Sequence, residues 1–195
     1  MIVDQKLIDD CIKGKNAAIK TIYSNYANIM FGICFRYSGN RLDAEDIMQE
    51  GFVKIFRHIK SFQGNGSFEG WMKKIMINSA LAFLKSKKKY CFIEDSEKLP
   101  EYGEDIFEKQ EMQYDITSEQ LITYIAQLPI SYRTILNMYA IENYSHREIA
   151  QTIGISENVS RTKFCRAKKL LLDMIEKHKI EHKVKKAIEV YEPQL

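Results

Sequence analysis

Apolar residues recur at steps of three and four over most of the chain, which is the spacing of one buried helix face. A first stripe, which ends at Gly39-Asn40, consists of Ile19, Ile22, Tyr23, Tyr26, Met30, Ile33, Cys34 and Tyr37. A second, from about Asp43, consists of Ala44, Ile47, Met48, Gly51, Ile55, Phe56 and Ile59. A third follows an N-cap at Ser67 and consists of Phe68, Trp71, Met72, Ile75, Met76, Ser79 and Phe83. Strong strand alternation is absent, so the chain is predicted to be all-α.

The helical pattern is lost between Tyr90 and Thr117, where Pro100, Gly103 and many acidic residues indicate a solvated linker. Only residues 106–114 retain some helical character there. The pattern returns after the linker with Leu121, Ile122, Ile125, Leu128, Ile135, Leu136 and Tyr139, broken once at Pro129. We therefore predict two small helical domains, 1–90 and 118–175, joined by an acidic linker at 91–117 and followed by a charged C-terminal tail at 176–195.

Residues 145–171 predict two helices joined by a tight turn. Ser145 and Glu148 have the S-x-x-E spacing of a capping box, and Gly154 supplies the positive φ that ends a helix. Ser156 is the expected N-cap of the second helix. The buried row of this helix is expected to contain Phe164, Ala167 and Leu171.

Ser160 extends that buried row into a position where an aliphatic residue is usual, and its hydroxyl is expected to bond the carbonyl one turn back. The opposite face carries Glu157, Asn158, Arg161, Thr162, Cys165, Arg166 and Lys169. Arginine and asparagine suit base edges in the major groove, and lysine and threonine suit phosphates. This pattern favours a helix-turn-helix DNA reader. An ordinary helical corner with a solvated edge is the alternative.

Charge is unevenly distributed, although the net charge is only +3. Residues 54–89 hold nine basic residues against one acid, and residues 94–119 hold ten acids against two lysines. In the basic block, the polar loop Gln63-Gly64-Asn65-Gly66-Ser67 precedes a helix that carries Lys73, Lys74 and Asn78. Basic residues beside aromatic ones suit unpaired bases. By contrast, Asp43, Glu45, Asp46, Gln49 and Glu50 form an acidic rim, which suits a protein partner with a basic surface.

The remaining residue types argue against other classes of protein. The four cysteines are far apart without a CxxC pair, and only His178 and His182 have a spacing that a metal site uses, so no metal or cofactor is expected. The N-terminus has acids where a signal peptide needs an apolar run, and no stretch approaches about 20 apolar residues. We expect a soluble, cytoplasmic protein without membrane insertion. No nucleophile–base constellation is present, so the chain is not expected to be an enzyme.

Two segments of the chain resemble a known family. The stretch RLDAEDIMQEGFVKIFRHIKSFQGNGSFEGWMKKIMINSALAFLKSKKK looks like conserved region 2 of the sigma-70 family. The stretch QLPISYRTILNMYAIENYSHREIAQTIGISENVSRTKFCRAKKLL looks like region 4. Both regions with only a short connector resemble the plan of extracytoplasmic-function (ECF) sigma factors, whose members direct bacterial RNA polymerase to promoters.

This resemblance implies a role for three sets of residues. Those that fall where the family docks on the β′ clamp helices of core RNA polymerase are Asp43, Glu45, Asp46, Gln49, Glu50 and Phe52. Those that fall where it captures flipped bases of the −10 element are Phe62, Gln63, Gly64, Asn65, Ser67, Lys74 and Asn78. Those that fall where it meets the −35 element are Ser156, Asn158, Arg161, Thr162, Lys163, Cys165 and Arg166.

The resemblance also implies partners: core RNA polymerase through its β′ clamp helices and β flap, promoter DNA, and an anti-sigma factor. The acidic linker is similar to linkers that thread the RNA path of the polymerase, and a simple solvated tether is the alternative. Asn158 and Ser160 depart from the glycine and the aliphatic residue that many relatives have, which leaves the −35 sequence open. A stand-alone helix-turn-helix regulator of transcription is the alternative function.

Overall fold

The computed structural model describes residues 5–86 and 116–191, with side chains as far as His178, and every helix and turn in these ranges agrees with the all-α prediction. The chain divides into two compact units, which comprise residues 1–90 and 91–195. None of the helices in the described ranges combines the length and the apolar character that a membrane crossing needs.

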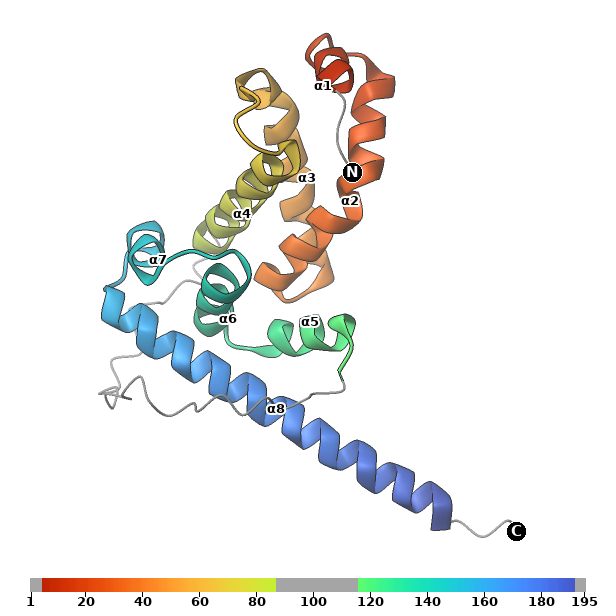
Figure 1. Ribbon diagram of the computed structural model, residues 1–195, viewed down its shortest axis with the longest axis vertical. Coiled ribbons are helices and arrows are strands. Elements are labelled where there is room, and N and C mark those ends of the chain that lie inside the picture. The colour runs from red at the N-terminus through yellow and green to blue at the C-terminus, as the bar shows by residue number, and fades with distance from the viewer. Residues whose placement is uncertain (1–4, 87–115, 192–195) are drawn as a thin grey trace. The chain divides into compact units, whose positions relative to one another are not determined.

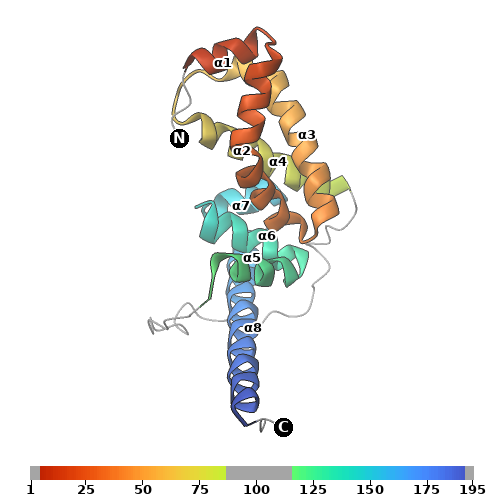
Figure 2. The same ribbon diagram turned by 90° about the vertical axis from the view of Figure 1, so that its right-hand side faces the viewer.

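The first unit is a bundle of helices α1 (Gln5–Ile12), α2 (Asn16–Ser38), α3 (Arg41–His58) and α4 (Phe68–Ser86), with a 3-10 turn, η1 (Ile59–Ser61), between the last two. Helices α2, α3 and α4 lie side by side in both views (Figure 1, Figure 2). Their predicted stripes meet in the core, where the fully buried side chains include Ile22, Met30, Cys34, Ile47, Ile55, Met72 and Met76. Burial raises the pKa of Cys34 to about 12.

Local signals in the sequence explain where these helices begin and end. Gly39 adopts a φ of 77° and ends α2, as predicted. Asn40 then caps α3 by accepting a hydrogen bond from the Asp43 backbone N–H at 2.9 Å. Ser67 caps α4 by accepting from the Gly70 N–H at 3.0 Å, which agrees with the predicted N-cap.

The second unit consists of α5 (Ser118–Gln127), α6 (Ile130–Leu136), a π-helical turn η2 (Asn137–Ile141), α7 (His146–Ile153) and α8 (Glu157–Tyr191). Helices α5, α6 and α7 all pack against α8, which continues past α5 as one long rod (Figure 1). The core between them contains Ile125, Leu128, Leu136 and Ala167. The predicted linker 91–117 lies almost entirely outside the described residues.

Buried Arg133 fastens α5 to α6. It is 4% exposed, and its Nη1 donates to the carbonyls of Ala126 and Leu128 at the end of α5. These carbonyls have no partner within their own helix, so the guanidinium satisfies them from the next helix. Burial lowers the pKa of Arg133 to about 10, which still leaves it charged at neutral pH.

Candidate DNA-binding and protein-binding surfaces

The helix-turn-helix predicted at residues 145–171 is formed by α7 and the start of α8. Ser145 Oγ accepts from the Glu148 N–H at 3.2 Å, and Glu148 Oε2 accepts from the Ser145 N–H at 2.8 Å, which confirms the capping box. The hydrogen bonds from Ser145 lower the pKa of Glu148. Gly154 ends α7 with a φ of 80°, and Ser156 Oγ accepts from the Val159 N–H at 3.2 Å at the start of α8. The turn is therefore built as its sequence predicts.

The outward face of α8 carries most of the predicted DNA-binding side chains. Asn158 and Arg161 are exposed, and Thr162, Cys165 and Arg166 are half-buried. Arg161 Nη2 lies 2.7 Å from Glu157 Oε1, an ion pair across one helical turn. Glu157 therefore restrains the orientation of the Arg161 guanidinium. This ion pair could have been predicted from the sequence, because the carboxylate and the arginine are four residues apart.

Lys163 does not belong to this face. Its side chain is 1% exposed, and its Nζ lies 5.7 Å from the centre of the Tyr132 ring. Lysine has a long apolar stem that packs well in a core when an aromatic ring receives its charged end. The prediction that Lys163 contacts DNA is corrected accordingly: it packs α8 against α6.

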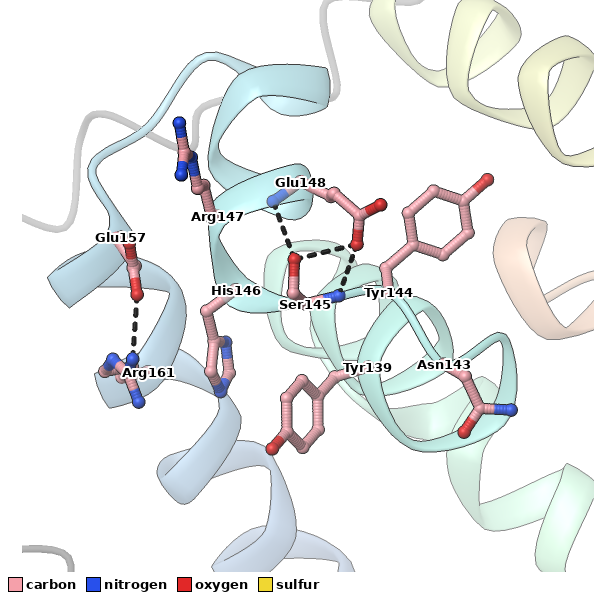
Figure 3. Close-up of a pocket in the computed structure, with 9 residues that line it drawn as sticks. All are labelled: Tyr139, Asn143, Tyr144, Ser145, His146, Arg147, Glu148, Glu157 and Arg161. Atoms are coloured by element: carbon pink, nitrogen blue, oxygen red, sulfur yellow. Dashed lines mark hydrogen bonds and ion pairs between the residues drawn. The ribbon is translucent and has the colours of Figure 1, made fainter.

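An open depression of about 490 Å³ lies beside the first turns of α8. Figure 3 shows Arg147 and the Glu157–Arg161 ion pair on one side of it and Tyr144 and Asn143 on the other, with His146 and Tyr139 stacked between them. Glu148 and Glu157 are the carboxylates that line it, and both already have partners in Ser145 and Arg161. The depression therefore presents two arginines, Arg147 and Arg161, of which Arg161 is paired with Glu157.

In the first unit, α3 exposes a stripe that combines acidic and apolar side chains. Leu42 is 77% exposed and Val53 is 55% exposed, and Asp46, Gln49 and Glu50 lie exposed between them at helical spacing. We call these five residues the α3 stripe. Sequence reasoning missed Leu42 and Val53. The signal that could have found them is their position, because both lie outside the apolar stripe of the core and on the same helix face as Asp46.

Ion pairs engage some of the acids on α3 and not others. Glu45 Oε1 lies 2.7 Å from Arg41 Nε, and Glu50 Oε1 lies 2.7 Å from Lys54 Nζ. Within residues 5–86 and 116–178, Asp46 has no such partner. Asp46 is therefore the carboxylate of the α3 stripe that is most available to another molecule.

Two residues predicted for the same surface lie in the interior instead. Phe52 is 4% exposed and its ring lies 4.7 Å from that of Tyr23. Asp43 is 7% exposed, because its carboxylate accepts from the Asn40 side chain at 2.9 Å and completes the cap of α3. Both predictions are corrected, since these side chains support the stripe from within and present little surface.

The loop between η1 and α4 carries most of the residues predicted for the −10 element. Gln63, Asn65 and Ser67 are exposed, and Gly64 and Gly66 adopt positive φ angles of 75° and 93°. Half-buried Phe62 closes the base of the loop, with its ring centre 5.2 Å from Phe68 and 5.7 Å from Trp71. The loop is thus a polar tip on an aromatic base.

Lys74 and Asn78 lie exposed one turn apart on α4, the helix that follows this loop. Lys73 is engaged by Glu69 at 2.7 Å, whereas Lys74 has no such ion pair within the described ranges. Lys74 therefore offers a cation without an ion-pair partner in the part of the chain that the structure describes, and Asn78 offers an exposed amide on the same face of α4. Within the described residues, no group of three or more His, Cys, Asp or Glu side chains is arranged to hold a metal ion.

Comparison with known proteins decides the family. The model of Sigma-70 region 2 matches residues 22–90, and that of Sigma-70, region 4 matches residues 118–171. The ECF RNA polymerase sigma factor SigE of Mycolicibacterium smegmatis is 30% identical over 159 residues, which are 80% of this chain and 61% of that protein. The ECF RNA polymerase sigma-E factor of Haemophilus influenzae is 26% identical over 184 residues, 90% of this chain and 96% of that protein. The chain belongs to the sigma-70 family, in its ECF subfamily.

The two matched regions of this ECF sigma factor contain all three candidate surfaces. Region 2 spans α3, the loop and α4, and region 4 spans the helix-turn-helix. Helix α1 lies outside both matches. Among solved structures, the sigma factor RpoE of Bartonella quintana in complex with the anti-sigma factor NepR aligns with a TM-score of 0.49 at 15% identity, over 80% of this chain and 96% of that one.

Proposed function

We propose that this ECF sigma factor is the dissociable promoter-specificity subunit of bacterial RNA polymerase. The α3 stripe binds the β′ clamp helices of the core enzyme, the loop 62–67 with α4 binds the melted −10 element, and the outward face of α8 reads the −35 element. The observation that carries this assignment is the α3 stripe, where an available carboxylate lies between two exposed apolar side chains. A protein that only binds DNA has no use for such a surface.

The composition of the α3 stripe favours a protein partner. Exposed Leu42 and Val53 would gain roughly 25 cal/mol per Å² of apolar surface when covered. Asp46 would repel the phosphate backbone of DNA but attract a basic protein surface. Its charge would contribute more to the alignment of the partner on the α3 stripe than to affinity. A basic, partly apolar surface on the polymerase therefore complements this stripe.

The loop and α4 suit a single strand of DNA. Flipping a base out of the stack costs a few kcal/mol, and stacking on an aromatic side chain returns roughly 1–3 kcal/mol per base. The half-buried rings of Phe62 and Trp71 offer such a face. Lys74 is placed to neutralise a phosphate, and Asn78, with Gln63, Asn65 and Ser67 of the loop, offers hydrogen bonds to an extruded base.

The start of α8 suits the major groove of duplex DNA. The first residues of a recognition helix contact base edges, and this helix presents Ser156, Asn158, Arg161 and Thr162 in its first turns. Cys165 and Arg166 continue the same face one turn later. The ion pair with Glu157 restrains the Arg161 guanidinium before DNA binds, which reduces the entropy lost on binding.

Transcription in vitro tests the proposal. Core polymerase with this chain should initiate at a defined promoter, and neither component alone should do so. Arg166→Ala should weaken use of that promoter by about 1–3 kcal/mol if Arg166 reads a base, with a preference lost at one position of the −35 element. Lys177→Ala, an exposed residue further along α8, is the matched control and should leave use unchanged.

A stand-alone helix-turn-helix regulator predicts a different result. In that case the isolated chain would bind a specific duplex tightly, and core polymerase would neither bind it nor alter its selectivity. The family resemblance also supports an anti-sigma factor as a proposed partner. A role that involves no catalysis by this chain is likewise part of the proposal.

A further inference from the structure

A buried polar pair joins the start of α7 to the first turns of α8, the segment that carries Arg161 and its neighbours. His146 is the first residue of α7 and is 8% exposed, and Ser160 lies in the first turns of α8 and is 0% exposed. His146 Nδ1 and Ser160 Oγ are 2.9 Å apart, within hydrogen-bond distance. The Ser160 hydroxyl thus bonds across the helix pair, whereas its sequence context predicts a bond to its own helix.

The histidine ring is held in place from a third element. It stacks on Tyr139 of η2, with ring centres 4.1 Å apart and planes 12° apart, and Phe164 of α8 meets it edge-on at 5.8 Å. Figure 3 shows the two stacked rings in the depression beside Arg161. A ring clamped in this way cannot turn toward a different partner without losing both aromatic contacts. The clamped ring therefore fixes the distance and the direction at which Nδ1 can bond the Ser160 hydroxyl.

A hydrogen bond constrains the helix crossing more tightly than an aliphatic contact does. Apolar side chains tolerate small slides and rotations, because dispersion and burial have little directional preference. A hydrogen bond weakens steeply when its distance or angle changes. Ser160 directly precedes Arg161, so any rotation of α8 about its axis that strains this bond also moves the Arg161 fork.

We propose that the His146–Ser160 hydrogen bond is a positioning contact that sets the orientation of the reading segment of α8, and thereby which −35 bases Arg161 and its neighbours prefer. The inference rests on the proposed function, because base preference has meaning only if α8 reads a promoter. Neither His146 nor Ser160 needs to touch DNA. Both act through the orientation of Arg161 and Asn158.

Two substitutions separate this role from general stability. Ser160→Ala removes the hydroxyl, and His146→Phe keeps an aromatic ring between Tyr139 and Phe164 but removes both ring nitrogens. Holoenzyme made with each full-length variant is assayed on a promoter library that is randomised at the −35 element, at a temperature below the melting point of each variant. Ile135→Val, which removes one buried methylene from α6, is the control for a small loss of packing.

Both variants should change the preference ratio at one or more −35 positions by about fivefold or more, the discrimination that a weak bidentate base contact supplies. Ile135→Val should keep the wild-type ranking. A uniform loss at every −35 sequence, or an unchanged ranking, in both variants overturns the inference. If a single variant does not fold, the double variant His146→Phe, Ser160→Ala is assayed in its place. Removing both partners leaves no unpaired polar group of this pair in the core. Failure of the proposed function looks different, since wild-type holoenzyme would then start at no promoter.

Discussion

His146 is a titratable side chain in the core of the helix-turn-helix, and its surroundings make the stability of that unit depend on pH. Burial lowers the pKa of its imidazole, Arg161 lowers it further, and Glu157 raises it. In the unfolded chain the pKa returns to about 6.5. The unfolded state therefore binds more protons, so the stability is fully present above about pH 6.5 and is lost as the pH falls through the lower pKa of the folded state.

We predict that acidification from pH 7.5 to pH 5.5 lowers the melting temperature of the second unit and that His146→Phe removes much of this dependence. The single tryptophan, Trp71, lies in the first unit, so its fluorescence follows that unit alone, whereas circular dichroism follows both. The difference between the two signals isolates the second unit. A pH dependence that is equally steep in the variant would show that other groups cause it.

Arg133 provides a second test at the scale of one residue. Arg133→Met keeps an apolar stem but removes the donor to two carbonyls at the end of α5. Hydrogen bonds from a charged donor contribute about 1.5–3 kcal/mol, so the variant should unfold the second unit at lower denaturant by about that amount. Arg147→Met, at an exposed position, should change stability by less than about 0.5 kcal/mol. Equal effects of the two substitutions would refute the role of Arg133.

Two of the three residues whose roles sequence analysis misjudged, Lys163 and Phe52, share a physical cause. Lys163, Phe52 and Asp43 were assigned to surfaces by residue type and by position in a family pattern. Burial of Lys163 and Phe52 depends on partners that another helix supplies, Tyr132 and Tyr23, and no local spacing reveals these partners. The true partner of Ser160 is equally non-local, since His146 lies fourteen positions away. Asp43 differs, because its partner Asn40 lies only three positions before it.

At the scale of helices, α3 and α4 are in tight contact at Gly51. A methyl group added there would lie 2.3 Å from Met76 Sδ, and Met76 is fully buried. We predict that Gly51→Ala costs about 1–3 kcal/mol through overpacking, because fully buried Met76 has little room to move, and that the higher helix propensity of alanine offsets up to about 1 kcal/mol of this cost. The net destabilisation is measured by denaturant unfolding with Trp71 fluorescence. Met76→Ala shortens the side chain that Gly51→Ala would meet. The double variant should therefore lose less stability than the sum of the losses in the two single variants. Destabilisation that simply adds in the double variant would contradict this explanation.

Helix boundaries were predicted best where a short-range signal exists. The capping box at Ser145, the turn at Gly154 and the end of α2 at Gly39 depend on neighbouring residues alone, and all three are confirmed. Helix α1 was not predicted, because its eight residues are too few for a clear periodicity and are stabilised by packing on α2. The π-helical turn at 137–141 was not predicted either, since it has no recognisable pattern in the sequence.

At the scale of the whole molecule, acidic and basic side chains lie on separate surfaces, to which we assign separate tasks. The α3 stripe presents Asp46 between apolar side chains, whereas α4 presents Lys74 and the reading face of α8 presents Arg161 and Arg166. The net charge of +3 conceals this separation. The account predicts that the charge of Asp46 matters for assembly with polymerase and that the basic side chains matter for promoter use.

Affinity for core RNA polymerase in Asp46→Lys tests this account most directly. Asp9→Lys makes the same charge change at an exposed position of α1 and serves as the control. Asp46→Lys should weaken binding at least about tenfold, since like charges brought together at an interface cost several kcal/mol, and Asp9→Lys should bind like the wild type. Wild-type affinity in Asp46→Lys, or the same loss in both variants, would contradict the assignment of the α3 stripe to the polymerase.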